Sequence, residues 1–207
     1  MIALDPRRTA VVAIDMHRGH LDPSVATLPL QPERCGPVIA RAAALFRELR
    51  ALGVPIVHVV TEYRDSREIA TNPFWRAIHD DPTKARKGIL KHNLAGSAGI
   101  EIIPALWEEG DLRVGNKKRY SCFHATDLEF LLRRLDAETL ILAGINTTTC
   151  VFNTAFEATN RDFAVVIAEE AVDSMDGEEM HRFALRVLAA AVGRVLSSEE
   201  ILKALRS

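Results

Sequence analysis

Short apolar runs alternate along the chain with longer stretches in which apolar residues recur every three or four positions. The runs are typical of strands buried on both faces, and the longer stretches are typical of helices with one buried side. The predicted strands cover residues 9–14, 55–60, 111–114, 140–143, 164–168 and 193–196. The predicted helices cover 37–52, 126–135, 150–158 and 178–191, with a short helix near Pro104 and a terminal helix from Ser197. This alternation predicts a three-layer α/β fold, a doubly wound parallel sheet of about six strands with helices on both faces.

Residues 1–207 are expected to form a single domain, because no repeat or linker interrupts the pattern and this length can bury a sizeable core. A net charge of -2 gives no general electrostatic reason to bind nucleic acid or an acidic membrane surface. No apolar run approaches the roughly 20 residues of a membrane-spanning helix, and the N-terminus lacks an export signal. The three cysteines, an odd and sparse number, fit a cytoplasmic protein better than a disulfide scaffold.

One stretch, residues 139–158, places a cysteine where a predicted strand turns into a helix. Cys150 opens that helix after three threonines that can serve as caps. The free amides and the positive dipole end of a helix lower the pKa of a thiol and can also stabilise an oxyanion. Cys150 is therefore a candidate nucleophile; the alternative is a buried structural thiol, the usual fate of a lone cysteine.

Two other charged residues follow predicted strands. Asp15 ends the first strand, and either Lys117 or Lys118 follows the third. The carboxyl ends of parallel strands share one edge of the sheet, where ligands of such folds bind. A thiol, a carboxylate and a lysine at this edge make a hydrolytic set: the thiol attacks a carbonyl carbon, the carboxylate moves the proton, and the lysine holds the carboxylate. The alternative for Asp15 is a loop cap.

Four side chains are candidates for contacts with a substrate. His20 lies in the loop after the first strand, where Gly19 can let the chain fold back, and Tyr63 follows the second strand. Trp75 lies in the irregular segment 64–99, and Thr147 lies just before the cysteine. Segments as long and irregular as 64–99 serve as active-site covers, subunit contacts or solvated loops. Phosphate-loop and GxGxxG motifs are absent, which weakens nucleotide binding, and no Cys/His cluster has structural zinc spacing.

Three ordered motifs carry a resemblance to a known family. The stretches VVAIDMHRGHLDP, NKKRYSCFHATDLEFLL and LILAGINTTTCVFNTAFEA, followed by AVVIAEEAV, closely resemble the isochorismatase-like cysteine hydrolases. That family includes nicotinamidase, N-carbamoylsarcosine amidase, biuret hydrolase and ureidoacrylate amidohydrolase. The resemblance extends from Thr9 to about Leu202, nearly the whole chain.

The resemblance implies a role for each matching residue. Asp15 matches the family's general base and acid, and Cys150 matches its nucleophile. Lys117 matches the family's lysine, because it stands three residues before the tyrosine of the K-x-R-Y-S pattern; Lys118 is then a solvated neighbour. The implied oxyanion hole uses the backbone N–H groups of Asn146 and Cys150, and the peptide bond between Ile145 and Asn146 is expected to be cis.

The resemblance also bears on cofactors, partners and substrate. Nicotinamidases carry a D-x-H…H metal pattern after the second strand, whereas this chain reads TEYRDSREIATNPFW there, so no metal and no cofactor are expected. Cys150 favours the amide-cleaving branch over the branch that hydrolyses the vinyl ether of isochorismate. The motifs GINTTTCV and RYSCFHATDLE look nearest to the carbamoyl-compound branch. A small-molecule amide or carbamoyl substrate and a homodimer or homotetramer are therefore expected.

The sequence thus predicts a metal-independent cysteine amidohydrolase that works through a thioester. Two alternatives stay open. One is a non-amidase hydrolase on the same fold, which would use Asp15 as an acid on an ether or ester. The other is a binding module in which Cys150 is a redox-sensing thiol, although no CxxC pair supports it.

Overall fold

The computed structural model describes residues 4–207, and in them six parallel strands form one sheet in the order β3-β2-β1-β4-β5-β6. The strands are β1 (Thr9–Ile14), β2 (Ile56–Thr61), β3 (Leu112–Lys117), β4 (Thr139–Ile145), β5 (Ala164–Asp173) and β6 (Arg194–Leu196). The central strands β1, β2 and β4 are almost wholly buried, as their continuous apolar runs indicate. The predicted doubly wound parallel sheet is confirmed.

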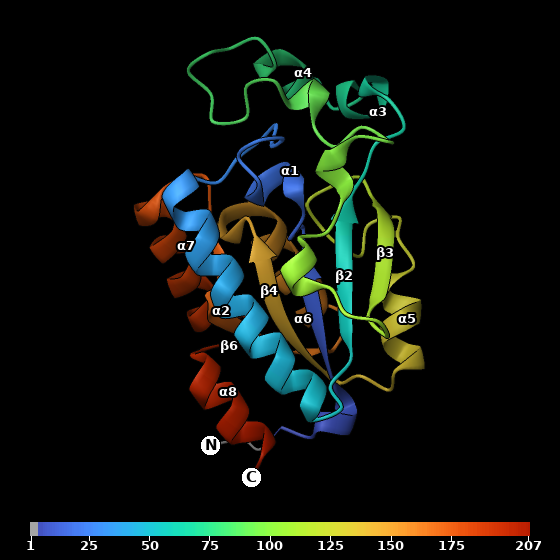
Figure 1. Cartoon of the computed structure of the whole chain (residues 1–207), viewed down its shortest axis with the longest axis vertical. Helices are drawn as coiled ribbons and strands as arrows, with labels where there is room; N and C mark the ends of the chain where they lie inside the picture. The colour runs from blue at the N-terminus through green and yellow to red at the C-terminus, as the bar shows by residue number, and fades with distance from the viewer. Residues whose placement is uncertain (1–3) are drawn as a thin grey trace.

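Helices cover both faces of this sheet (Figure 1). Helices α2 (Pro32–Ala51) and α8 (Ser198–Leu205) pack on one face, against alternate strand residues such as Val11 and Ile141. Helices α5 (Leu128–Arg134), α6 (Phe152–Thr159) and α7 (Glu178–Ala191) pack on the other, against the intervening residues such as Val12 and Leu142. The result is the predicted three-layer arrangement. Within the described part of the chain, no helix combines the length and apolarity needed to cross a membrane.

Residues 64–99, named here the cover, lie across the carboxyl ends of the strands (Figure 1). They are less irregular than expected, since they contain the short helices α3 (Ser66–Ala70) and α4 (Pro73–Ile78) and the 3₁₀ turns Ile89–Lys91 and Ala98–Ile100. A third and smaller apolar cluster holds the cover in place; it consists of Leu28, Tyr63, Ile69, Trp75, Ile78 and Ile89. A further short helix, α1 (Arg18–Leu21), follows β1. The 3₁₀ turns Pro6–Arg8 and Pro104–Leu106 complete the elements, apart from the turn at Cys150 described below.

The structure corrects some predicted boundaries. Strand β3 continues to Lys117 instead of ending at Val114, because it is an edge strand whose partly exposed residues do not form a continuous apolar run. Strand β5 likewise continues beyond its apolar run, to Asp173. Helix α2 begins at Pro32, five residues before the predicted start, and Pro37 lies inside it.

The largest correction concerns Cys150. The residues Thr147–Val151 form one π-helical turn, and the α-helix α6 begins only at Phe152. Just before this turn, Gly144 has a φ of +128°, and a Cβ there would lie 2.0 Å from the carbonyl oxygen of Ile14. Glycine therefore lets the end of β4 approach the end of β1 closely. This approach brings the turn that carries Cys150 next to Asp15.

Candidate active site

Asp15 is the first residue after β1, and its side chain is completely buried at the carboxyl edge of the sheet. Its φ of 52° lies in the left-handed region, which aspartate tolerates better than most residues. Thr61, the last residue of the neighbouring strand β2, donates two hydrogen bonds of 2.8 Å to Asp15 Oδ1, one from its backbone N–H and one from its hydroxyl. The carboxylate is therefore held by the adjacent strand.

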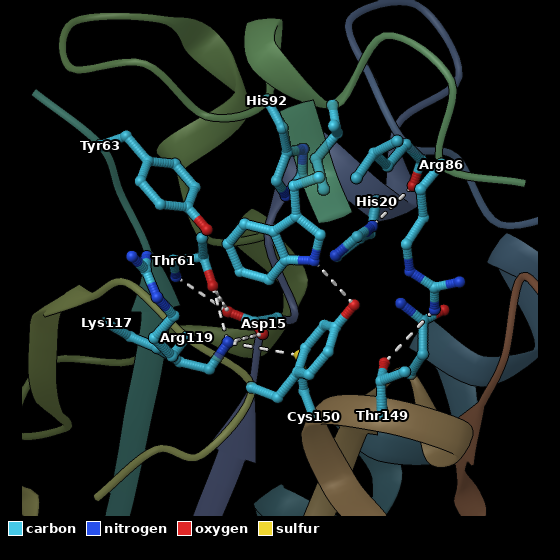
Figure 2. A pocket seen from close by; sticks show the side chains of 15 residues that line it. Asp15, His20, Thr61, Tyr63, Arg86, His92, Lys117, Arg119, Thr149 and Cys150 are labelled. Atoms are coloured by element: carbon cyan, nitrogen blue, oxygen red, sulfur yellow. Dashed lines mark hydrogen bonds and ion pairs between the residues drawn. The ribbon is translucent and has the colours of Figure 1, made fainter. Parts of the chain in front are cut away.

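Lys117, the last residue of β3, joins the other two predicted groups (Figure 2). Its ammonium donates to Asp15 Oδ2 at 2.6 Å, to the Thr61 hydroxyl at 2.7 Å and to the sulfur of Cys150 at 3.3 Å. These three acceptors match the three donors of a lysine side chain. Lys118 points elsewhere: it donates to the carbonyl of Glu62 and pairs with Glu68. The structure thus brings Asp15, Lys117 and Cys150 together and leaves Lys118 outside the group.

The buried ion pair keeps both of its charges. Burial by itself would raise the pKa of Asp15, but Lys117 and His17 hold that pKa well below its ordinary value. Burial would likewise lower the pKa of Lys117, but Asp15 and Cys150 raise that pKa well above its ordinary value. An ionised carboxylate is therefore present beside the thiol and is able to accept a proton.

The thiol itself does not behave as the sequence predicted. Burial raises the pKa of Cys150 to about 11; Lys117 opposes this rise, while Asp15 adds to it by its charge and a hydrogen bond. The expectation of a thiolate favoured by a helix N-terminus is wrong for the resting protein. The physical reason is that the sulfur lies buried in a π turn beside a carboxylate, not at an open helix end.

The peptide bond between Ile145 and Asn146 is cis, as predicted. Asn146 borders the same cavity as Cys150, and its carbonyl accepts hydrogen bonds of 3.1 Å from the N–H groups of Thr149 and Val151. The main chain from 146 to 150 therefore folds around the cavity. An oxyanion hole formed by the N–H groups of Asn146 and Cys150 stays a prediction.

A cavity of about 40 Å³ opens onto the three groups. Three of the four predicted substrate contacts, His20, Tyr63 and Trp75, lie in its wall. Thr147 does not: it is buried, its hydroxyl lies 3.0 Å from His181 Nδ1, and the turn directs Thr149 to the cavity in its place. The remaining wall residues are Asp15, Leu28, Thr61, Arg86, Ile89, His92, Lys117, Arg119, Tyr120, Asn146 and Cys150.

Two groups of wall residues were not recognised in the sequence. Thr61 occupies the same kind of strand end as Asp15, so the rule that selected Asp15 could have found it. Arg86 and His92 come from the cover, and no local pattern identifies them. Arg86 pairs with Asp176 at 2.8 Å and reaches Thr149, the neighbour of Cys150 in the chain.

His92 also joins a cluster that the sequence did not reveal. A ring nitrogen from each of His17, His20 and His92 lies within 4.8 Å of the others, in a set that could hold a metal ion. The expectation of no metal rested on the absence of histidine from residues 61–75, and all three of these residues lie outside that segment. Chemically, the site offers a thiol, an adjacent carboxylate, a buried ammonium and a cluster of three histidines.

Comparisons with known proteins agree with this fold and show the family. Residues 9–200 match the family described as the isochorismatase domain. The chain is 31% identical to YecD, an uncharacterized isochorismatase family protein of Escherichia coli O157:H7, over 99% of this chain and 100% of that protein. It is 29% identical to the ureidoacrylate amidohydrolase RutB of Methylobacterium radiotolerans, over 94% of this chain and 78% of that protein. The solved structure of a cysteine hydrolase from Pseudomonas syringae has the same fold, with a TM-score of 0.82 over 100% of this chain and 96% of that one at 22% identity.

Proposed function

This chain belongs to the isochorismatase family of hydrolases, and on that premise we propose that it is a cysteine amidohydrolase. The bond cleaved is the C–N bond of a small amide or carbamoyl compound. The observation that carries the proposal is the position of the Lys117 ammonium, 2.6 Å from Asp15 and 3.3 Å from the sulfur of Cys150. The similarity to an amidohydrolase along most of the chain supports the choice of an amide.

In the first half of the reaction, Cys150 attacks the carbonyl carbon of the substrate. As the S–C bond forms, the thiol proton passes to Asp15, and the carbonyl oxygen becomes an oxyanion that the N–H groups of Asn146 and Cys150 stabilise. When this intermediate collapses, the C–N bond breaks and Asp15 returns the proton to the leaving nitrogen. The products of this half are ammonia or an amine and a thioester on Cys150.

In the second half, water attacks the thioester carbon and Asp15 accepts a proton from that water. Collapse of the second oxyanion breaks the C–S bond, the sulfur recovers a proton, and the acid leaves. The sum is one amide and one water converted to one acid and one amine, with the thiol restored.

Lys117 acts in both halves of the reaction from the same position. It holds the Asp15 carboxylate ionised and oriented while burial acts to neutralise it. The same ammonium lowers the pKa of the thiol, so it opposes the cost of forming negative charge on sulfur. Thr61 fixes the opposite oxygen of the carboxylate.

The tight cavity and its aromatic and cationic wall favour a compact, polar substrate. The proposal names the amide or carbamoyl class and leaves the individual compound to a screen. Assembly into a homodimer or homotetramer is also proposed, and size-exclusion chromatography with light scattering tests it.

The test is ammonia or amine release from a panel of small amides, ureas and carbamoyl acids. Cys150→Ser should lower kcat/KM for the best substrate by at least about a thousandfold, because the nucleophile is lost. The control is Cys35→Ser, on the distant helix α2, which should keep the parent rate. A stoichiometric acyl-enzyme seen by mass spectrometry supports the thioester. Parent-like amide hydrolysis by Cys150→Ser would refute the mechanism, and reversible oxidation without turnover would favour the sensor alternative.

A further inference from the structure

Three histidines from two distant parts of the chain meet beside the catalytic group. His17 and His20 follow β1, whereas His92 comes from the cover. All three are buried, at 0%, 4% and 3% exposure respectively. Their ring centroids form a nearly regular triangle with sides of 4.8 Å, 4.8 Å and 5.7 Å. Nothing in the proposed thioester chemistry uses this arrangement.

The hydrogen bonds of His20 and His92 leave one ring nitrogen of each available. His20 Nδ1 lies 2.6 Å from the carbonyl oxygen of Leu28, so Nδ1 carries the proton and Nε2 keeps its lone pair. His92 Nδ1 lies 2.8 Å from the hydroxyl of Thr27, which can accept the Nδ1 proton in the same way. Metal-binding histidines characteristically donate their second ring N–H to a carbonyl or another fixed acceptor.

His17 supplies the second, independent indication. Its Nδ1 is buried and has no hydrogen-bond partner among residues 4–207. Buried polar atoms are almost always paired, so an orphaned nitrogen inside a histidine cluster requires an explanation. Its other nitrogen, Nε2, accepts from the amide of Asn93 at 2.9 Å and lies 3.6 Å from Asp15 Oδ1. A cation at Nδ1 would move the ring proton to Nε2, so the hydrogen bond from Asn93 would be lost and the ring would have to turn for Nε2 to donate to Asp15 Oδ1, now 3.6 Å away.

We propose that His17, His20 and His92 form a binding site for a first-row divalent transition-metal ion, with zinc as the reference case. Three imidazoles are a donor set that suits zinc, copper, iron and nickel. Three protein ligands leave a coordination position open, as in catalytic rather than structural zinc sites. Because His20 and His92 lie in the cavity wall, the open position faces the space next to Cys150.

The present spacing is close to what such an ion needs. Zinc–nitrogen bonds of about 2.0–2.1 Å at tetrahedral angles place ligand nitrogens about 3.4 Å apart and ring centroids about 5 Å apart. The centroid triangle already has this size, whereas the nitrogens lie within 4.8 Å of one another. Metal binding therefore requires the rings to reorient by about an ångström at their nitrogens.

Charges beside the cluster act on a cation in opposite senses. The Asp15 carboxylate, whose Oδ1 lies 3.6 Å from His17 Nε2, attracts a cation, whereas the Lys117 ammonium, 2.6 Å from Asp15 Oδ2, repels it.

A metal ion at the three histidines would have a role that goes beyond the proposed function and does not depend on the thioester. An ion held here with one open position would bind an oxygen or nitrogen atom of whatever enters the cavity. It would orient that molecule before the thiol reacts. This proposal departs from the expectation of no metal, and its ligands come from the loop after β1 and from the cover.

The test uses the full chain, freed of metal by dialysis against a chelator and titrated with Co²⁺ and then Zn²⁺. One Co²⁺ per chain should bind with visible ligand-field absorption, and Zn²⁺ should displace it. His20→Gln and His92→Gln should each weaken Co²⁺ affinity at least about tenfold, by loss of a ligand. His124→Gln, the same change at an exposed histidine, should bind as the parent does. Circular dichroism melting verifies that each variant is folded.

The outcomes separate this proposal from the amidase proposal, since the readout is spectroscopic. Cys150→Ser should retain the Co²⁺ spectrum while losing turnover. Absence of saturable Co²⁺ and Zn²⁺ binding by the parent chain would overturn the site, as would parent-like binding by folded His20→Gln and His92→Gln variants. Loss of the spectrum in Cys150→Ser would also overturn it, because the sulfur rather than the histidine cluster would then be the ligand.

Discussion

The sheet edge and the cover are both walls of one cavity, but different forces hold them in place. Asp15, Lys117 and Cys150 lie at or just beyond the ends of β1, β3 and β4, where parallel strands bond to one another. A buried ion pair and the two hydrogen bonds from Thr61 join them. The cover instead rests on a small apolar cluster and on short helices of five and six residues.

In the proposed enzyme, the sheet edge would carry the reacting groups and the cover would recognise the substrate. Asp15 and Lys117 are placed at the ends of strands and Cys150 in the turn after β4, where the whole core maintains the distances between them. Trp75, Arg86 and His92, which would select the molecule that enters, are placed on a segment with little core of its own. Substitutions in the cover can therefore change the substrate while the reacting groups stay where they are.

The largest expected effect comes from Lys117→Met, which removes the ammonium and keeps a side chain of similar length. It leaves the Asp15 carboxylate buried without its cation, so we expect a loss of about 3–5 kcal/mol in the free energy of unfolding. Amide hydrolysis should fall at least about a hundredfold, because Asp15 loses its orientation. Urea denaturation and kcat/KM measure the two effects.

Lys118→Met is the matched control, one residue away. Its side chain is 25% exposed and pairs with Glu68 outside the group formed by Asp15, Lys117 and Cys150, so the change should lower stability less than Lys117→Met does. If the two variants lost activity equally, the distinction between the sheet edge and its surroundings would be wrong.

The second prediction concerns how the thiol reacts in the absence of substrate. Since burial raises the pKa of Cys150 to about 11, its thiolate fraction should rise about tenfold per pH unit between pH 8 and 10. Brief treatment with iodoacetamide, followed by mass spectrometry of the peptide that contains Cys150, measures this rise. Circular dichroism at each pH verifies that the protein is folded. A labelling rate that levels off below pH 8 would contradict the raised pKa.

The third and smallest effect is expected in the cover. Trp75 is 4% exposed, packs in the apolar cluster and donates to the hydroxyl of Tyr120 at 3.2 Å, whereas its neighbour Phe74 is 62% exposed. Trp75→Ala should raise KM about tenfold and change kcat less, because it disturbs the wall and not the reacting groups. Phe74→Ala should leave both constants near the parent values. A loss confined to kcat in Trp75→Ala would place that residue in the chemistry.

The sequence was sufficient for the elements whose apolar residues form a clear pattern, either a continuous run or a helical spacing. Helix α7 was predicted at residues 178–191 and β1 at 9–14, because continuous or regularly spaced apolar residues leave few alternatives. The terminal helix was found through Ser197, whose side chain and Glu200 form a capping box. The edge strand β3 was predicted to end too early, because its partly exposed residues do not form a continuous apolar run.

For the site, the sequence was sufficient where a residue's position follows from the end of a strand. Asp15 was identified by that rule, and Lys117 was separated from Lys118 by the family motif. Thr147 and Thr149 could not be separated, since a single π turn decides which of them faces the cavity. The contact of His92 with His17 depends on how the cover folds back over about 75 residues, and no local pattern encodes such a contact.

The position of β3 at the outer margin of the sheet has a consequence for the evolution of the enzyme. Its backbone bonds to β2 alone, whereas β1 and β4 each have a strand on both sides. Lys117 is thus carried by an edge strand, whereas Asp15 directly follows β1, which is paired on both sides, and Cys150 lies in the turn after β4. Mutations along this outer strand are therefore expected to move the ammonium with less disturbance of the core than mutations in β1 or β4, so they offer a route to tune turnover gradually.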